Sequence, residues 1–435
     1  MKLIVIHHHL NPGGVTRIIQ SQVSSLRQQH PDMAISLMAA RVPNPGFFED
    51  LGVKLILNED LDYLQDQEIT ADQAGGLLNR LNAFLDQHVD SHCLLHVHNL
   101  NLGKNPVMTF ALSQQAAKGI RLVNHSHDFA EDRPVNLSFL KRVIEGLLKQ
   151  NLHKVLYPGY DNYHYAVLNS FDYERLEKAG IDTGHITLLP NPVHFEKHKN
   201  LRREQARKIV AENLDLDLSK KIITYPVRVI RRKNIGELIL FAVIFGEKAN
   251  WLVTQPPQNP VEIEFYQQWK TFCKNHRIDI VFEAGTKASF ENLLTASDVC
   301  ITTSVREGFG MVFLEPWLLD TPVMGRNISY VTADLLENGI AFPLLYDHLK
   351  VNHKGREQDF AELEQEEQME YLVALVQSQA KREEVVQKNP DLEKLFEQVS
   401  PKTINHNKEI VQQKYSLENY GNRLDEIYKK VDQSI

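Results

Sequence analysis

The segment whose residue types most clearly suggest chemistry is Arg306–Glu315, which reads Arg-Glu-Gly-Phe-Gly-Met-Val-Phe-Leu-Glu. It follows an apolar run, Val299–Thr303, that we expect to be a strand, and we expect a helix to begin near Phe309. Glu307 would then lie in the loop and Glu315 about two turns along that helix. The two carboxylates could each accept hydrogen bonds from hydroxyl groups at the two ends of one extended ligand.

The same segment offers donors to an anion. Glycines let the backbone approach a ligand closely, and the free N–H groups at the start of a helix favour a negative charge. The backbone positions that would line such a site are Gly308, Phe309, Gly310, Met311 and Val312. The plain alternative is a helix cap followed by an unrelated glutamate.

A second candidate is the basic segment 226–234, Pro-Val-Arg-Val-Ile-Arg-Arg-Lys-Asn. It directly follows an expected strand, at the edge where open α/β sheets bind ligands. Clustered cations repel one another unless an anion joins them, and a diphosphate fits both the charge and the place. The four cations of this segment are candidate ligands of such an anion, and a solvated basic loop is the alternative.

A third candidate is the turn 11–17, Asn-Pro-Gly-Gly-Val-Thr-Arg, between the first expected strand and the first expected helix. Gly13 and Gly14 would allow a ligand close to the backbone, and Arg17 lies in the first helical turn, where the helix dipole slightly disfavours a cation. A bound acid or phosphate would explain that arginine. A tight turn with a surface arginine explains it equally well.

The chain contains 19 histidines, and two pairs of them alternate along expected strands. His96 and His98 would point to one face of their strand, as would His125 and His127. Such pairs near strand ends could bind a metal, with Asp128 adding a carboxylate. They could also line a ligand pocket or be hydrogen-bonded structural residues, and the spacing alone leaves these three interpretations open.

Short apolar runs alternate with segments of helical spacing, which predicts βαβ units and parallel sheets. The expected strands are Lys2–Ile6, Ala34–Met38, Val53–Leu57, Cys93–His98, Arg121–His125, Lys154–Leu156, Tyr165–Val167, Ile222–Val227, Trp251–Thr254, Ile278–Phe282, Val299–Thr303 and Pro322–Met324. The expected helices are Val15–Gln29, Ile235–Phe245, Val261–His276, Ser289–Thr295, one beginning near Phe309, and Leu417–Val431. Residues 355–400 are charged and helical in pattern. We therefore expect two doubly wound α/β domains.

Length and composition agree with this organisation and exclude several classes of protein. The 435 residues are too many for one ordinary hydrophobic core, and 43% apolar with 24% charged residues is typical of a globular protein. A net charge of −8 gives no support to a general nucleic-acid binder. Three distant cysteines suit a reducing compartment, and we expect a cytoplasmic protein without a signal peptide or transmembrane segment.

The segment Arg306–Glu315, with Ser297-Asp298-Val299 before it and Thr321-Pro322-Val323 after it, resembles the signature of glycosyltransferase family 4. Other landmarks of the family follow in its order along most of the chain, and the likeness is weakest in residues 40–90 and 345–400. They are the Gly13-Gly14 turn, the Arg228 and Lys233 spacing, Pro190-Asn191-Pro192-Val193, Phe282-Glu283-Ala284-Gly285, and Glu418-Asn419-Tyr420 with Tyr428. The chain departs from the family pattern at Thr254-Gln255-Pro256-Pro257, at Pro192 and at Gly325-Arg326-Asn327-Ile328-Ser329.

The resemblance implies the GT-B fold, with two Rossmann-like domains facing across a cleft. Residues 1–195 would form an acceptor-side domain and 196–409 a nucleotide-sugar domain, while 410–435 would cross back to the first. The implied activity is transfer of a hexosyl group, with retention, from a UDP-, GDP- or ADP-sugar to an acceptor hydroxyl. No cofactor or metal would be required.

The resemblance also implies roles for single residues. Glu315 would bind the ribose hydroxyls, Glu307 the O3/O4 region of the sugar, and Arg228 with Lys233 the diphosphate. His127, or else His125, would bond a donor hydroxyl. The implied catalytic residues are Glu307, His127, Arg228 and Lys233, and further donor contacts would come from Gly14 and Gly285.

The acceptor side is less defined. It would include Gly13, Arg17, His98, His125 and Asn191, and the acceptor would be a sugar, a small molecule or a lipid-linked molecule, with peripheral membrane contact still open. A GT-B phosphorylase and an inactive nucleotide-sugar-binding relative are the two rival interpretations. We see no lysine in the sequence that a phosphorylase's pyridoxal cofactor would single out.

Overall fold

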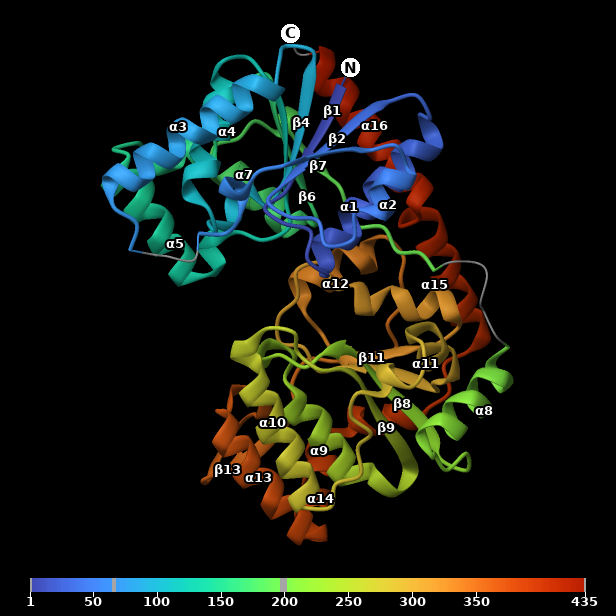
Figure 1. Ribbon diagram of the computed structural model, residues 1–435. Helices are drawn as coiled ribbons and strands as arrows, with labels where there is room; N and C mark the ends of the chain where they lie inside the picture. Colours follow the sequence, from blue (N-terminus) through green and yellow to red (C-terminus); the bar gives the residue numbers. More distant parts are fainter. Residues whose placement is uncertain (1, 65–67, 196–201, 434–435) are drawn as a thin grey trace. The chain divides into compact units, whose positions relative to one another are not determined.

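The computed structural model describes residues 2–64, 68–195 and 202–433. The chain divides into two compact units: Met1–Pro192 with Tyr415–Ile435, and Val193–Lys414 (Figure 1). The boundary expected between residues 195 and 196 adjoins 196–201, which lie outside the described residues. No helix in the described part of the chain combines the length and the apolar character that crossing a bilayer requires.

The described strands of the first unit form one parallel seven-stranded sheet in the order β3-β2-β1-β4-β5-β6-β7. The order reverses between β1 and β4, which is where doubly wound sheets place their ligands. The strands are β1 Lys2–Ile6, β2 Ala34–Ala39, β3 Lys54–Leu57, β4 Cys93–His98, β5 Arg121–Ser126, β6 Tyr163–Val167 and β7 Ile186–Leu188.

Helices cover both faces of this sheet. The described helices are α1 Gly14–Gln29, α2 Gly46–Asp50, α3 Ala71–His88, α4 Pro106–Ala117, α5 Pro134–Lys141, α6 Leu152–Leu156, α7 Ser170–Lys178 and α16 Leu417–Gln433. A π-helical turn, Arg142–Leu147, extends α5. Short 3-10 turns lie at Glu59–Leu61, Leu100–Leu102, Ala130–Asp132 and Thr183–His185.

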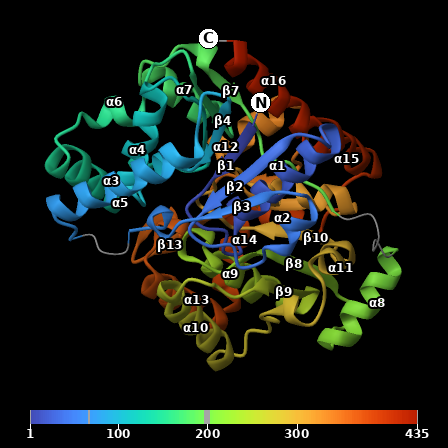
Figure 2. The same cartoon turned by 45° about the horizontal axis from the view of Figure 1, so that its top comes forward.

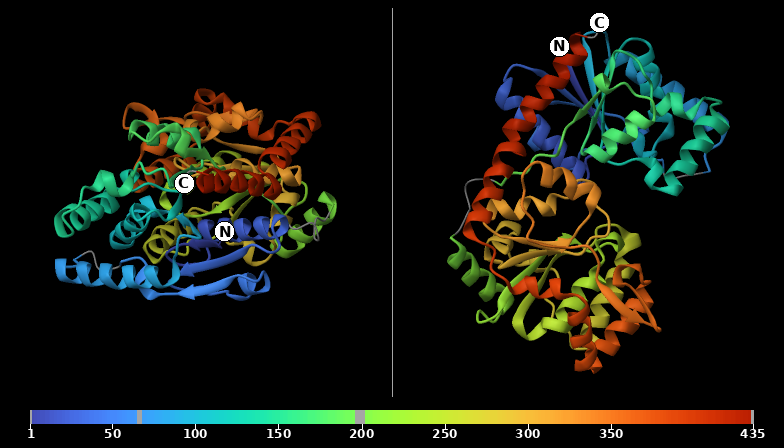
Figure 3. Two further views of the ribbon diagram at one scale, coloured as in Figure 1. Left: turned by 90° about the horizontal axis from the view of Figure 1, so that it is seen from above. Right: turned by 180° about the vertical axis from the view of Figure 1, so that it is seen from behind.

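The alternation of β1 divides the core of the first unit into two layers. Leu3 and Val5 pack with α1 and α16 on one face, whereas Ile4 and Ile6 pack with α3 and α4 on the other. Figure 2 shows α3 and α4 side by side, and the rear view in Figure 3 shows the red α16 on the opposite side of the sheet. Helix α16 buries one face against this layer, through Tyr420, Leu424, Ile427, Tyr428 and Val431.

The second unit contains a parallel sheet in the order β12-β11-β10-β8-β9 and a separate antiparallel hairpin, β13-β14. Its strands are β8 Lys221–Arg228, β9 Ala249–Gln255, β10 Val299–Thr302, β11 Val323–Arg326, β12 Leu344–Tyr346, β13 Lys350–His353 and β14 Arg356–Asp359. The order reverses between β8 and β10. The prediction of two doubly wound α/β domains is therefore confirmed.

Helices surround the second sheet as well. They are α8 Arg203–Leu214, α9 Ile235–Phe245, α10 Pro260–Asn275, α11 Phe290–Ala296, α12 Ser329–Glu337, α13 Gln365–Gln377, α14 Gln379–Lys388 and α15 Pro401–Lys414. Described 3-10 helices are Arg231–Lys233, Gly246–Lys248, Ala284–Thr286, Met311–Phe313, Glu315–Leu319, Phe360–Glu362 and Pro390–Phe396.

Two predicted strands are wrong. Lys154–Leu156 belongs to helix α6, because the side chain of Asn151 caps that helix by accepting from Lys154 N at 2.9 Å. Ile278–Phe282 contributes only a single bridge, between Val281 and Leu252 of β9. The chain leaves the sheet directly afterwards, since Glu283 adopts a left-handed conformation with φ 61°.

The helix expected to begin near Phe309 is also wrong. Two short 3-10 helices, Met311–Phe313 and Glu315–Leu319, replace it, and the chain breaks direction at Leu314 (φ −120°, ψ −48°). Pro316 explains the break, because proline has no N–H to continue an α-helix and its ring clashes with the preceding turn.

Candidate functional site

Three of the sequence-predicted donor residues, Arg228, Lys233 and Glu307, lie at the switch point of the second sheet. Arg228 ends β8, and the 3-10 turn Arg231–Lys233 follows it. Glu307 follows β10, the neighbouring strand on the other side of the reversal. The carboxyl ends of both strands therefore bring one basic and one acidic loop together, as the position of the motifs predicts.

Glu307 joins two of the cations. Its Oε1 forms an ion pair with Lys233 Nζ, and its Oε2 lies 3.0 Å from Arg232 Nη1. The same guanidinium donates to the carbonyl oxygen of Arg306 at 2.7 Å. The predicted basic cluster thus holds its own anion, and the carboxylate is fixed between two positive charges.

This ion pair is almost withdrawn from solvent, because the side chain of Lys233 is 11% exposed and that of Glu307 is 7% exposed. Burial by itself raises the pKa of Glu307, but the charges of Lys233 and Arg232 outweigh it and hold the pKa below its ordinary value. Burial also lowers the pKa of Lys233, although its ion pair with Glu307 opposes that shift. The structure therefore keeps a nearly dry, charge-balanced group at the switch point.

The basic turn is held from beneath by hydroxyl groups. Thr303 Oγ1 donates towards the carbonyl oxygens of Lys233 at 3.0 Å and Asn234 at 2.9 Å, and Tyr225 donates to the Lys233 carbonyl. Asn234 adopts a left-handed conformation with φ 53°, which ends the turn and starts α9. These contacts fix the backbone that carries Lys233.

Glu307 is held on its backbone side by Tyr330 of α12. The hydroxyl of Tyr330 accepts from Glu307 N at 3.1 Å and donates to Glu307 O at 3.0 Å. One phenol thus satisfies both backbone groups of the acidic residue. Its carboxylate is left to face Lys233 and Arg232.

Two further donor candidates, Arg228 at the end of β8 and Gly285, lie beside the end of β9. Arg228 Nε is 3.4 Å from Gln255 Oε1. Gly285 lies so close to the backbone of β9 that a Cβ added there would meet the carbonyl oxygen of Thr254 at 2.8 Å. The departure Thr254-Gln255-Pro256-Pro257 therefore lies directly beside Arg228 and Gly285.

The segment 308–315 differs from its predicted shape. Gly310 is left-handed (φ 81°), and a Cβ there would come within 2.6 Å of Val331 Cγ1. Glu315 begins the second 3-10 helix, so the placement two turns along an α-helix is wrong. Since Met311–Phe313 is only three residues long, a strong helix dipole cannot be expected of it, and the backbone donors of Phe309, Gly310 and Met311 depend on loop geometry.

The candidates of the first unit form a second group. Gly13 caps α1 in extended conformation and Gly14 begins it, with no acidic residue in the first turn. Arg17 is exposed on that helix. Asn191 is buried, and its Oδ1 has no hydrogen-bond partner among the described residues.

The predicted histidine pairs do come together, across neighbouring strands β4 and β5. His96 Nε2 lies 3.2 Å from His125 Nδ1, and His98 Nδ1 lies 2.9 Å from His127 Nε2. His7, which follows β1, places Nδ1 3.2 Å from the carbonyl oxygen of His98. The strand ends at the switch point of the first sheet are thus lined by imidazole rings.

These rings are uncharged near neutral pH. Burial lowers the pKa of His96 to about 3 and that of His127 to about 3, and it lowers the pKa of His98 and His125 well below the ordinary value. Each neutral imidazole keeps one nitrogen lone pair, which can accept a hydrogen bond from a ligand or bind a cation.

Sequence reasoning missed four residues that complete the two groups. Arg232 lay inside the quoted basic run but was not singled out, and nothing in the sequence linked Tyr330 to Glu307. Gln22 and Tyr428 contact the histidines: Gln22 Oε1 is 2.8 Å from His98 Nε2, and the Tyr428 hydroxyl is 2.9 Å from His96 Nδ1. Gln22 and Tyr428 each fall on a predicted helix, yet their histidine partners lie far away along the chain.

No family model matches the sequence. Mannosylglucosyl-3-phosphoglycerate synthase of Petrotoga mobilis is 30% identical over 346 residues, which are 76% of this chain and 65% of that protein. The chain thus spans slightly less than two thirds of that relative.

Among solved structures, sucrose-phosphate synthase from Thermosynechococcus elongatus superposes with a TM-score of 0.64, at 13% identity and over 100% of both chains. Anabaena HepE in complex with UDP and glucose gives a TM-score of 0.61, at 13% identity and over 99% of both chains. The chain therefore has the two-domain Rossmann-like fold of GT-B glycosyltransferases.

Proposed function

We propose that this chain is a retaining glycosyltransferase of family 4 that transfers a hexosyl group from a UDP-, GDP- or ADP-sugar to an acceptor hydroxyl. The observation that carries the proposal is the group Arg232, Lys233 and Glu307 at the switch point of the second sheet. Lys233 and Glu307 of this group lie in the segments that resemble the family's motifs. Transfer from a nucleotide sugar is also supported by the synthase name of the Petrotoga mobilis relative and by the UDP bound to the structural neighbour HepE.

In this proposal Lys233 and Arg228 neutralise the diphosphate of the donor. The leaving diphosphate gains negative charge in the transition state, so fixed cations lower the barrier without any reorganisation. They would also replace the metal ion that other sites use for the same purpose. Glu307 holds Lys233 in place before the donor arrives and then shares its oxygens with hydroxyls of the sugar.

Glu315 would bind the ribose. As is usual in the family, the leaving phosphate would accept the proton that the acceptor hydroxyl loses as it attacks. No side-chain nucleophile is needed. His127 would contact a donor hydroxyl, and Gly14, Gly285 and the 308–312 backbone would line the donor.

The acceptor would be held by the first unit, near Gly13, Arg17, His98, His125 and Asn191. The name of the Petrotoga mobilis relative describes a product built on phosphoglycerate. A phosphorylated sugar acid is therefore the acceptor class to test first, and the uncapped start of α1 with Arg17 would suit its negative charge.

A thermal-shift panel of UDP, GDP, ADP and their sugars tests the donor half directly, because a ligand that binds the native state raises its melting temperature. One nucleotide should stabilise the protein in the wild type and not in Lys233→Ala. Lys408→Ala is the matched control, since Lys408 also pairs with a carboxylate of the same unit, Asp320, but on the surface. Equal stabilisation of Lys233→Ala and the wild type would refute the assignment.

A further inference from the structure

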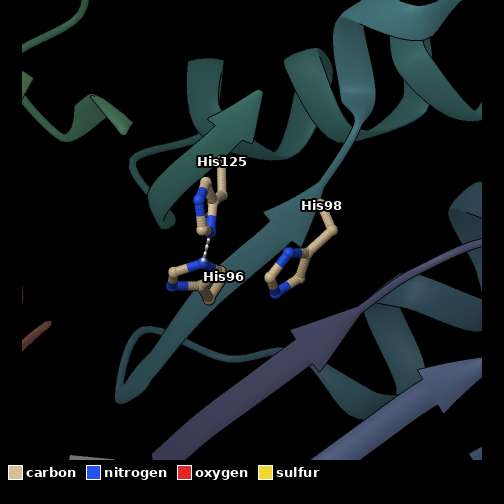
Figure 4. A group of neighbouring side chains, drawn as sticks. All are labelled: His96, His98 and His125. Carbon is tan, nitrogen blue, oxygen red and sulfur yellow. Dashed lines mark hydrogen bonds between the residues drawn. The ribbon is translucent and has the colours of Figure 1, made fainter. Parts of the chain in front are cut away.

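Three imidazole rings meet at the ends of β4 and β5: His96, His98 and His125 (Figure 4). Each offers one nitrogen, and these nitrogens all lie within 4.8 Å of one another. All three side chains are fully buried. We propose that they form a binding site for a late transition-metal dication, Zn²⁺ foremost, that stabilises the first unit.

The donor set fits that class of ion. The rings are held neutral by burial, and a neutral imidazole nitrogen is a common ligand of zinc, nickel and copper. Magnesium and calcium prefer oxygen ligands, and none of the three ligands supplies one. The three imidazole ligands therefore disfavour Mg²⁺ and Ca²⁺.

The spacing brings the three rings close enough to converge on one ion. Their ligand nitrogens all lie within 4.8 Å of one another, whereas two nitrogens bound to one tetrahedral Zn²⁺ at about 2.0–2.1 Å lie roughly 3.4 Å apart, so small ring movements must accompany binding. Water would complete the coordination, as it does at zinc ions with three protein ligands.

His125 gives an independent indication of a ligand. Its Nε2 is buried and has no hydrogen-bond partner in the described ranges. An unsatisfied buried nitrogen costs roughly 1–3 kcal/mol, so its presence calls for a compensating group. When the proton resides on Nδ1, Nε2 of His125 carries a free lone pair for a cation, and binding of the ion by His96 would replace its hydrogen bond with His125.

The surroundings orient the rings as the outer shell of a metal site does. Gln22 Oε1 accepts from His98 Nε2 at 2.8 Å, which leaves the lone pair of His98 on Nδ1, the nitrogen that His127 Nε2 contacts at 2.9 Å. Gln22 Nε2 in turn donates to the Tyr428 hydroxyl at 2.8 Å, and that hydroxyl contacts His96 Nδ1 at 2.9 Å. Such partners fix ring orientation and tautomer, and their loss typically costs 10–100-fold in metal affinity.

The test uses the full chain, purified without a metal-affinity column and stripped with a chelator. After incubation with Zn²⁺ and dialysis, elemental analysis should find one zinc per chain and a raised melting temperature. Co²⁺ should give visible d–d bands of a low-coordinate nitrogen site. No retained zinc and no cobalt bands in the wild type would overturn the proposal.

Variants locate the ion. His125→Gln should lose zinc retention at least tenfold, whereas His164→Gln should keep it, because His164 is a buried histidine of β6 whose partner is Thr187 and not the trio. Tyr428→Phe removes one hydroxyl without opening a large cavity and should weaken binding roughly 10–100-fold. If His125→Gln does not fold, Tyr428→Phe becomes the test of the site. Unchanged zinc affinity in Tyr428→Phe would then contradict the proposal.

The zinc readout does not require turnover, so it can fail separately from the proposed function, which also places His98 and His125 on its acceptor side. His127→Gln should retain the ion and lose turnover, since His127 is assigned to the donor and not to the metal. Loss of the ion in His127→Gln would indicate that His127 is a ligand and would contradict a site made of His96, His98 and His125.

Discussion

The ammonium group of Lys233 and the carboxylate of Glu307 form a nearly buried ion pair between the loops that follow β8 and β10. Arg232 contacts the second carboxylate oxygen at 3.0 Å. In the proposed function, a diphosphate that enters this site would meet cations already fixed by an internal anion, so its binding would move few side chains. Preorganised charges of this kind lower the activation free energy of a reaction whose transition state develops negative charge.

Substitution of either partner should abolish most turnover. Glu307→Gln and Lys233→Ala should each lower kcat by about 100–1,000-fold, the scale expected when one preorganised electrostatic group is removed. Initial rates with the nucleotide sugar found in the thermal-shift panel measure this. Glu367→Gln, which affects a surface ion pair with Lys354 in the same unit, should keep its rate.

Both active-site variants should still fold, since Arg232 remains to pair with Glu307 in Lys233→Ala. Circular dichroism verifies that. Full activity in either folded variant would contradict the assigned roles.

Turnover should not depend on added Mg²⁺ or Mn²⁺, because in the proposed function Arg228 and Lys233 would supply the positive charge at the diphosphate. Rates measured with and without these ions should agree. The histidine trio does not disturb the comparison, since imidazole nitrogens do not favour Mg²⁺. A strict requirement for either ion would contradict the proposed donor chemistry.

Stability should fall as the solution becomes more acidic. Burial lowers the pKa of His164 to about 3 and of His8 to about 4. Because each imidazole has a lower pKa in the folded chain than in the unfolded one, the unfolded chain binds more protons between about pH 4 and 6.5. Stability is therefore retained above the unfolded pKa and decreases below it, by up to about 1.4 kcal/mol per pH unit for each group.

Urea unfolding between pH 7 and pH 5 measures this dependence. His164→Gln should flatten it, while His92→Gln, an exposed histidine of the same unit, should not. An identical slope in His164→Gln and the wild type would contradict the interpretation.

Gly310→Ala should destabilise the second unit through a contact as well as through the backbone. Gly310 has φ 81°, and a Cβ there would approach Val331 Cγ1 to 2.6 Å. Gly355 has a similar φ of 77° but open space around it, so Gly355→Ala carries only the backbone cost of about 1–2 kcal/mol. The excess destabilisation of Gly310→Ala should be about 1–3 kcal/mol. Equal free energies of unfolding for the two variants would contradict this prediction, because they would mean that the Val331 side chain moves aside without loss of stability.

The strands of both sheets could largely be predicted from the sequence, because buried parallel strands are continuous apolar runs. Lys154–Leu156 failed since a run of three residues fits a helix as well, and the deciding feature was the cap at Asn151. The hairpin β13-β14 was missed because Lys354 occupies a left-handed turn position (φ 50°) before Gly355, where Asn or Asp would have signalled a turn.

The candidate site was predictable where motif and strand end coincide, as for Lys233 and Glu307. It was not predictable where the contact joins distant elements. Tyr330 reaches Glu307 across 23 positions, and Tyr428 reaches His96 across 332. Sequence pattern describes one element at a time, so such partners emerge only once the elements pack.

Calorimetric titration of the wild type, Lys233→Ala and Lys408→Ala with the preferred nucleoside diphosphate is the most direct test of the central claim. The account predicts one site per chain, an affinity at least tenfold weaker in Lys233→Ala, and no change in Lys408→Ala. Failure of UDP, GDP and ADP alike to bind the wild type, or undiminished affinity in Lys233→Ala, would contradict it.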